Sequence, residues 1–272
     1  MDLKLSVVIG TPDLAEWPYQ LFSGTFEEKI QKAADSGFDG VELICRDMDL
    51  VDREAVKETL RRYNLECPAL NTGPVYGVDG LCLVSPDKEI EQRGMYQLKR
   101  FLEFAGEFGA LVDIGMLRGK MSIMPDRAAA EEALVGKMHQ AAEHAAHCGA
   151  RIIVEPLNRF ESDFVHSAHD GVELAGRVNH PNFGMLVDTF HMNIEDVSIE
   201  ESVREAAGCC LWHVHVGDSN RLSAGKGHFD FPELIRVLKE VKFKGFLSAE
   251  HVALPDPDTA AQETIRYLRP LL

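Results

Sequence analysis

The chain has 272 residues, of which 45% are apolar and 26% charged, a balance typical of a folded globular protein and unlike that of a disordered one. Its 28 basic and 44 acidic side chains give a formal charge of -16, which makes nucleic acid a poor partner because an acidic surface repels phosphate. We find neither the roughly 18 consecutive apolar residues of a membrane span nor the features of a signal peptide at the start, MDLKLSVVIG, so we expect a cytoplasmic protein without a membrane partner.

Short apolar segments alternate with longer amphipathic ones about eight times along the chain. The predicted strands are 3–9, 38–44, 65–71, 110–116, 151–157, 183–189, 211–217 and 245–251, and the predicted helices are 25–36, 52–63, 87–108, 127–148, 167–178, 199–207, 231–241 and 257–269. Eight such pairs favour an α/β fold of the (β/α)8 TIM-barrel type, in which one domain commonly needs about 250 residues. We therefore expect a single barrel domain over residues 1–272. An open doubly wound sheet is less favoured, because no G-x-G-x-x-G follows the first strand.

Helix ends are marked by residues of the expected kinds. Gly37 and Gly149 follow two predicted helices, at the position where glycine commonly ends a helix. Thr25, Asp52 and Ser198 precede others, where a side-chain oxygen caps free N–H groups. Six cysteines are scattered without C-x-x-C spacing, so we expect free thiols, with the adjacent pair at 209 and 210 used in packing.

Polar side chains end four consecutive strands in the second half of the chain. Glu155 follows RIIV, Asp188 ends FGMLV, and Glu250 follows GFLSA. The seventh strand, LWHVHV, carries His213 and His215 on one face because they are two residues apart. In a barrel of this type the carboxyl ends of all strands meet at the catalytic face, so these side chains converge.

Three carboxylates and one imidazole form a ligand set for one divalent metal ion. Each acid alone could cap a helix and each histidine could be a bonded core residue, but four at successive strand ends would carry an uncompensated desolvation cost. An oxygen-rich set with one nitrogen suits Mn²⁺, Mg²⁺ or Co²⁺, and Zn²⁺ is also compatible with it. The strand pattern alone allows either His213 or His215 to be the ligand.

Three segments carry a family resemblance: VEPLNRFE, VDTFHMNIE and HVHVGDSNR, in that order. They resemble the ketose 3-epimerase branch of the xylose-isomerase-like TIM barrels, which includes the D-tagatose and D-psicose 3-epimerases. The resemblance is most specific between residues 151 and 227. It implies an isomerase that inverts a ketose at carbon 3, with a small sugar as substrate and a homodimer or homotetramer as the assembly.

The resemblance also implies a role for individual residues. Glu155, Asp188, His215 and Glu250 match the metal ligands, which selects His215 over His213. Glu155 and Glu250 match the two catalytic acid/base groups, and a two-base mechanism needs two such groups. The residues that match substrate contacts are His191, Arg221 and Glu161. Trp17, in the first loop, could offer an apolar face to a sugar or could serve as a packing plug.

Two departures from the family pattern leave the sugar open. Glu250 is followed by His251 and Val252 where proline and phenylalanine are common, and the fourth strand ends in IGMLRGK without the expected tryptophan or glycine pair. Alternatives on the same fold are an aldose-ketose or hydroxypyruvate-type isomerase, an inositol-pathway dehydratase and a non-catalytic sugar-binding barrel. An AP-endonuclease-type DNA hydrolase is disfavoured by the charge and by the lack of further histidines after the third and fourth strands.

Overall fold

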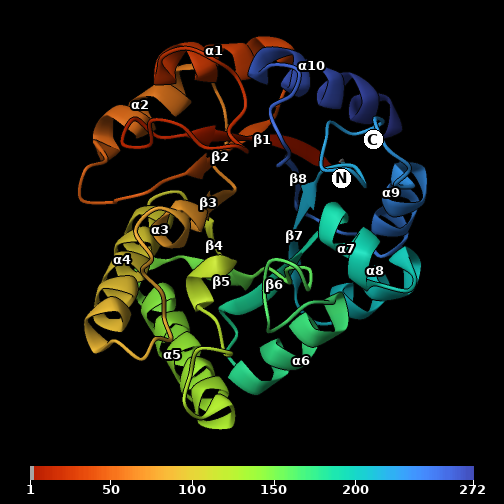
Figure 1. The fold of residues 1–272 in the computed structure, drawn as a ribbon. Helices are drawn as coiled ribbons and strands as arrows, with labels where there is room; N and C mark the ends of the chain where they lie inside the picture. The colour runs from red at the N-terminus through yellow and green to blue at the C-terminus, as the bar shows by residue number, and fades with distance from the viewer. Residues whose placement is uncertain (1–2) are drawn as a thin grey trace.

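The computed structural model describes residues 3–272 and forms a closed barrel of parallel strands surrounded by helices (Figure 1). The strands follow one another around the barrel in chain order: β1 (Lys4–Gly10), β2 (Gly40–Ile44), β3 (Ala69–Asn71), β4 (Leu111–Ile114), β5 (Arg151–Val154), β6 (Phe183–Asp188), β7 (Leu211–Val216) and β8 (Phe246–Ala249). The barrel closes between β1 and β8, where Lys4 lies opposite Phe246. The predicted (β/α)8 fold is confirmed.

Eight long helices lie close to their predicted bounds: α1 (Phe26–Ser36), α2 (Arg53–Arg62), α4 (Lys88–Gly106), α5 (Arg127–Cys148), α6 (Ala168–Val178), α8 (Ile199–Ala207), α9 (Phe231–Glu240) and α10 (Pro257–Leu268). Short helices that the sequence did not predict are α3 (Gly73–Gly77), α7 (Thr189–Glu195) and the 3-10 helices η1 (Met116–Arg118) and η2 (Arg269–Leu271). Three of these follow strands at the catalytic face. In Figure 1 the first and last long helices lie side by side, and Lys32 of α1 pairs with Asp258 of α10.

Some strands are shorter than predicted, for local reasons. Strand β3 begins at Ala69 and not at residue 65, because Pro68 has no N–H to donate to a ladder. Strand β5 ends at Val154, just before Glu155 and Pro156. Strand β4 ends at Ile114 because the chain turns at Gly115 into η1.

The predicted helix caps are present. The side chain of Thr25 accepts a hydrogen bond from the main-chain N–H of Glu28, and the Glu28 carboxylate accepts one from the main-chain N–H of Thr25. The side chains of Asp52 and Ser198 likewise accept a hydrogen bond from a main-chain N–H in the first turn of α2 and of α8. Gly37 and Gly149 end α1 and α5 in the left-handed conformation that glycine adopts without strain.

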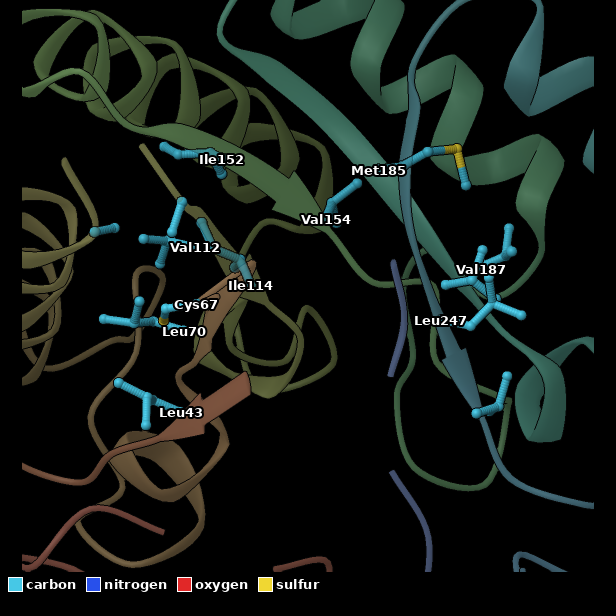
Figure 2. Close-up of a cluster of buried hydrophobic side chains, with 14 of the residues drawn as sticks. Leu43, Cys67, Leu70, Val112, Ile114, Ile152, Val154, Met185, Val187 and Leu247 are labelled. Carbon is cyan, nitrogen blue, oxygen red and sulfur yellow. The ribbon is translucent and has the colours of Figure 1, made fainter. Parts of the chain in front are cut away.

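The main hydrophobic core lies between the outer face of the barrel and the helices. Each strand alternates, so every second residue points outward. Figure 2 shows outward-facing side chains from several neighbouring strands, among them Leu43, Val112, Val154, Val187 and Leu247. Full burial of one such side chain stabilises the fold by about 1.5–3 kcal/mol.

The remaining strand residues face the barrel axis and change in character from one end to the other. At the amino-terminal end, Ala69, Leu111, Ile153 and Leu186 form a separate apolar cluster against Trp212. Above it lie buried polar side chains: Ser6, Glu42, Asp113, His213 and Ser248. The interior therefore becomes polar towards the catalytic face.

A bulge between β6 and β7 changes the register once. Met185 lies opposite Leu211, but the next residue, Leu186, lies opposite His213, so Trp212 is an extra residue in β7. Consequently Trp212 and His213 both face the interior although they are adjacent in sequence. Above the bulge, Asp188 lies opposite His215.

In the described part of the chain, no helix has the length and apolar character that a membrane crossing requires. The six cysteines are free thiols. Cys210 packs in the core as expected, whereas Cys209 is exposed, so the packing prediction for the pair is right for one member only.

Candidate metal centre

Four consecutive strands bring Glu155, Asp188, His215 and Glu250 together at the catalytic end of the barrel. Asp188 is the last residue of β6, His215 lies near the end of β7, and Glu155 and Glu250 directly follow β5 and β8. One ligand atom from each of the four lies within 4.8 Å of those from the other three. The convergence predicted from the strand ends is therefore present.

The facing atoms of this cluster have no hydrogen-bond partner in the protein. Glu155 Oε1, Asp188 Oδ2, His215 Nδ1 and Glu250 Oε2 are all buried and unpaired. Leaving buried polar atoms unpaired is costly, so such atoms normally have a ligand, an ion or a water. Three carboxylate oxygens and one imidazole nitrogen aimed at one point fit a divalent cation.

The two glutamates of the cluster have opposite pKa shifts. Burial and the nearby Glu155 carboxylate raise the pKa of Glu250 to about 8, although His215 opposes the shift. Burial also disfavours the charged form of Glu155, but the charge of the nearby His215 outweighs it and lowers the Glu155 pKa. His215 Nδ1 lies 3.4 Å from Glu155 Oε1 and 3.6 Å from Glu250 Oε2. Without a metal ion, the pair therefore favours one protonated and one ionised carboxyl group.

The two histidines of β7 differ in their surroundings. His215 Nε2 lies 3.0 Å from Glu42 Oε1, and His213 Nε2 lies 2.8 Å from Glu42 Oε2. Burial disfavours the charged Glu42, but the two imidazoles hold its pKa well below the usual value. Only His215 also reaches Glu155 and Glu250. The geometry thus separates two histidines that the strand pattern alone left equivalent.

The three predicted substrate contacts surround this cluster. His191 accepts a hydrogen bond of 2.7 Å at Nδ1 from the Asn158 amide, which leaves its Nε2 as a buried, unpaired donor. That Nε2 lies 3.9 Å from Glu155 Oε1 and 3.8 Å from Asp188 Oδ2. Arg221 donates to Glu161 Oε1 at 2.7 Å, and its Nε is also buried and unpaired.

Comparison with known proteins supports one family. The model of the xylose isomerase-like TIM barrel family matches residues 30–271. The chain belongs to this family.

Relatives of this xylose isomerase-like barrel include several sugar epimerases. An L-ribulose 3-epimerase of Methylomonas sp. (strain DH-1) is 30% identical over 89% of this chain and 84% of its own length. A 3-dehydro-D-guloside 4-epimerase of Escherichia coli (strain K12) is 26% identical over 96% of this chain and 98% of its own. Among solved structures, an L-ribulose 3-epimerase has a TM-score of 0.84 with 22% identity, covering 100% of this chain and 95% of the other, which bears on the fold alone.

Trp17 lies at the mouth of this xylose isomerase-like barrel, in a half-buried position. It packs against Val8, Leu14 and Ile44. A Cβ atom on Gly77 would overlap its ring, so the indole fits closely against α3. Of the two interpretations of Trp17, a sugar contact or a packing plug, these contacts favour the packing plug.

Tyr19, two residues further along the same loop, was not predicted and lies closer to the site. Its ring centre is 4.2 Å from the Arg221 guanidinium, and Phe190 lies 4.8 Å from the same group. Burial raises the pKa of the Tyr19 hydroxyl, with Arg221 opposing the shift. The two rings hold Arg221 between them by cation–π attraction.

Other supporting residues were also missed. Glu42 lies in an apolar strand, GVELI, where a fully buried acid is itself unusual and could have been noticed. Asn71 donates a hydrogen bond of 3.2 Å to Glu250 Oε1. Arg118 is fully buried and donates a hydrogen bond to the main-chain carbonyl oxygen of Glu155. No periodicity distinguishes an arginine of this kind from one on a surface loop.

Proposed function

We propose that this protein is a metal-dependent ketose 3-epimerase, which inverts the carbon next to a ketone in a small sugar by two-base proton transfer. The observation that carries the proposal is the pair Glu155 and Glu250. Their carboxyl groups belong to the same candidate ligand cluster, and their pKa values are shifted in opposite directions. An epimerase needs one base to take a proton from carbon and one acid to return a proton. The relatives include an L-ribulose 3-epimerase and a D-psicose 3-epimerase, which agrees with this reaction.

Glu155, Asp188, His215 and Glu250 would hold one divalent ion, with Mn²⁺ as the first choice and Mg²⁺, Co²⁺ or Zn²⁺ as alternatives. When bound, the ion supplies Lewis-acid stabilisation of negative charge on the substrate oxygens. The protein's own groups move the proton. The ionised glutamate accepts the proton from carbon 3, and the protonated glutamate donates its own to the same carbon, so one proton leaves and one arrives. General acid/base catalysis of this kind contributes about 10²- to 10⁴-fold.

We assign sugar binding to His191, Arg221 and Glu161. The unpaired Nε2–H of His191 and Nε–H of Arg221 can each donate a hydrogen bond to a substrate oxygen. Glu161 can accept from a hydroxyl group while it holds Arg221. Their convergence around the two glutamates would fix which carbon lies between them.

Deuterium exchange provides the direct test. The protein is loaded with Mn²⁺ and incubated in deuterated water with a panel of ketoses, including phosphorylated ketoses and 3-keto glycosides. We expect deuterium at carbon 3 of one ketose and formation of its 3-epimer. Absence of exchange with every ketose would refute the proposal. Exchange with inversion at carbon 4, aldose formation or loss of water would instead indicate a 4-epimerase, an aldose-ketose isomerase or a dehydratase.

We also propose that the chain is one barrel domain that forms a homodimer or homotetramer in the cytoplasm. Phe160 is 81% exposed and Val197 is fully exposed, and apolar side chains of this size favour burial at an interface. Free cysteines are usual in a reducing compartment. Light scattering coupled to size-exclusion chromatography tests the assembly, and a monomeric mass would refute it.

A further inference from the structure

We propose that Glu42 is a positioning residue, which together with His213 fixes the orientation and tautomer of His215 so that Nδ1 faces the metal ligands. The inference rests on the proposed metal centre, but it concerns a residue outside the ligand set. Glu42 lies in β2, and its carboxylate meets both histidines of β7 inside the barrel. All three side chains are completely buried.

The hydrogen bonds of Glu42 determine which nitrogen of His215 is free. A carboxylate only accepts hydrogen bonds, so Nε2 of His215 must carry a hydrogen to donate across the 3.0 Å to Glu42 Oε1. A neutral imidazole has one N–H, so Nδ1 then keeps its lone pair. Nδ1 is the atom that lies near Glu155 and Glu250. Glu42 thus selects the tautomer that a metal ligand at this place requires.

His213 keeps the Glu42 carboxylate in this orientation. Its Nε2 lies 2.8 Å from Glu42 Oε2, so both oxygens of the carboxylate are engaged by the same strand. The two imidazole rings also pack edge to face, with centres 5.3 Å apart and planes at 86°. Rotation of Glu42 away from His215 would break the bond to His213 as well. His213 therefore supports Glu42 and is not an alternative metal ligand.

Glu42, His213 and His215 could themselves surround an ion, but their contacts argue against that use. Both oxygens of Glu42 already accept N–H groups at hydrogen-bond distance. In the other set, by contrast, the four facing atoms of Glu155, Asp188, His215 and Glu250 have no partner. An ion between Glu155, Asp188, His215 and Glu250 would satisfy unpaired atoms. An ion at Glu42 would displace existing hydrogen bonds.

The main test replaces Glu42 by glutamine and measures metal binding. The amide has the same shape, but it accepts from one imidazole and donates to the other, so one histidine must change tautomer. We expect Mn²⁺ to bind about 10- to 100-fold more weakly in Glu42→Gln, as measured by isothermal titration calorimetry. Ser248→Ala is the control, because Ser248 lies opposite His215 in the sheet and its buried hydroxyl has no hydrogen bond. It should leave the affinity unchanged.

A second measurement reports the tautomer directly. Nitrogen-15 spectra of the metal-free protein, recorded at a pH alkaline enough for neutral imidazoles, should show the hydrogen of His215 on Nε2 in the parent and Ser248→Ala. In Glu42→Gln one of the two histidines should shift towards Nδ1–H, because the amide N–H₂ needs an acceptor. A purely structural role for Glu42 would lower the unfolding temperature without moving either the tautomer or the metal affinity. That outcome overturns the proposal.

His213→Phe keeps the test decisive if Glu42→Gln does not fold. It preserves an aromatic ring while removing one hydrogen bond from Glu42, so we expect a loss of about 10-fold in metal affinity. Unchanged affinity and an unchanged His215 tautomer in His213→Phe overturn the proposal. Failure of the proposed function is a separate result: a parent protein that binds metal and responds to Glu42→Gln, but exchanges no ketose proton, refutes the epimerase and leaves the role of Glu42 standing.

Discussion

Arg118 Nη1 donates a hydrogen bond of 2.7 Å to the main-chain carbonyl oxygen of Glu155. The same guanidinium also donates to the carbonyls of Gly115, Phe164 and Val165 and to the hydroxyl of Ser162. Arg118 is completely buried. One side chain therefore ties the end of β4 to the loop that carries Glu155.

Arg118→Met should destabilise the fold strongly, because it leaves several buried carbonyl oxygens unpaired. We expect the free energy of unfolding to fall by about 3–5 kcal/mol, the range for breaking a buried charged network. Urea denaturation followed by circular dichroism measures this. Arg93→Met, at an exposed position of α4, is the control and should change stability by less than about 0.5 kcal/mol. A similar small loss in both variants would contradict the anchoring role.

Glu250→Gln should preserve the barrel and nearly abolish turnover. The amide is isosteric but cannot exchange a proton with carbon, so kcat should fall by about 10²- to 10⁴-fold. The assay is ketose epimerisation at saturating metal. Glu66→Gln, an exposed acid at the opposite end of the barrel, is the matched control. Substantial activity in Glu250→Gln would refute the two-base assignment.

Removal of divalent metal should lower the unfolding temperature. Three buried carboxyl groups and His215 would then face one another without a cation. Restoring the ion at about 100 times its dissociation constant should stabilise the protein by about 2.7 kcal/mol. Differential scanning calorimetry after chelation and after addition of Mn²⁺ measures the shift. Asp188→Asn should respond less to the ion, and an equal response in this variant would argue against Asp188 as a ligand.

The metal-free protein should lose stability as the pH rises from about 7 to about 8.5. Burial raises the pKa of Glu250 to about 8, and burial together with nearby carboxylates raises that of Asp113. Charged neighbours, chiefly Glu42 and Glu250, raise the pKa of His215 although burial opposes the shift. The folded chain thus holds protons that the unfolded chain has already released, and this stabilisation is lost as the pH rises through the folded pKa values.

His213 and His251 do not alter this sign. Burial lowers the pKa of both, so above about pH 7 both are neutral in the folded and unfolded chains. Thermal unfolding of chelated protein across this pH range provides the measurement. Metal-loaded protein should show a flatter profile, because a bound cation lowers the pKa values of the groups that face it, so that fewer protons are lost in this range. An unfolding temperature that rises with pH in the chelated protein would contradict the assignment.

Arg221→Lys should weaken substrate binding although it keeps the positive charge. Lysine cannot lie flat between Tyr19 and Phe190 and cannot donate from a planar fork. We expect KM to rise by about 10-fold, equivalent to about 1.4 kcal/mol. Steady-state kinetics and the metal dissociation constant distinguish this from a loss of metal. Weaker metal binding with unchanged KM would refute the assignment of Arg221 to substrate binding.

The sequence predicted the barrel because its alternation is strong and its caps are local. Thr25 and Gly37 mark helix ends through the hydrogen bonds of their own segments, and Asp188 and Glu250 follow apolar runs whose direction in a barrel is known. Helix α7 was missed because it begins at Thr189, directly after β6, so that Asp188 both ends the strand and caps the helix. A strand pattern gives no indication of such an immediate change.

The supporting residues of the site depend on contacts between distant segments. Glu42 and His213 are 171 positions apart, and Tyr19 reaches Arg221 from the opposite end of the chain. Side-chain periodicity reports which face a residue occupies but not which partner it meets there. The convergence of Glu155, Asp188, His215 and Glu250 was predictable because strand ends meet at one face of a barrel, whereas the hydrogen-bond partners of these residues required the folded geometry.

The extra residue at Trp212 allows one strand to serve two unrelated purposes. Below it, Trp212 plugs the amino-terminal end of the barrel, while above it His213 and His215 keep a fixed phase relative to Asp188. Shortening β7 by this residue would restore regular pairing, with Leu211 on the outer face opposite Met185, and would remove the aromatic ring from the inner face. The residues that close the amino-terminal end of the barrel can therefore change without moving His213 and His215 only while the bulge is retained. The length of β7, more than the identity of residue 212, is thus the constraint on any redesign of the barrel.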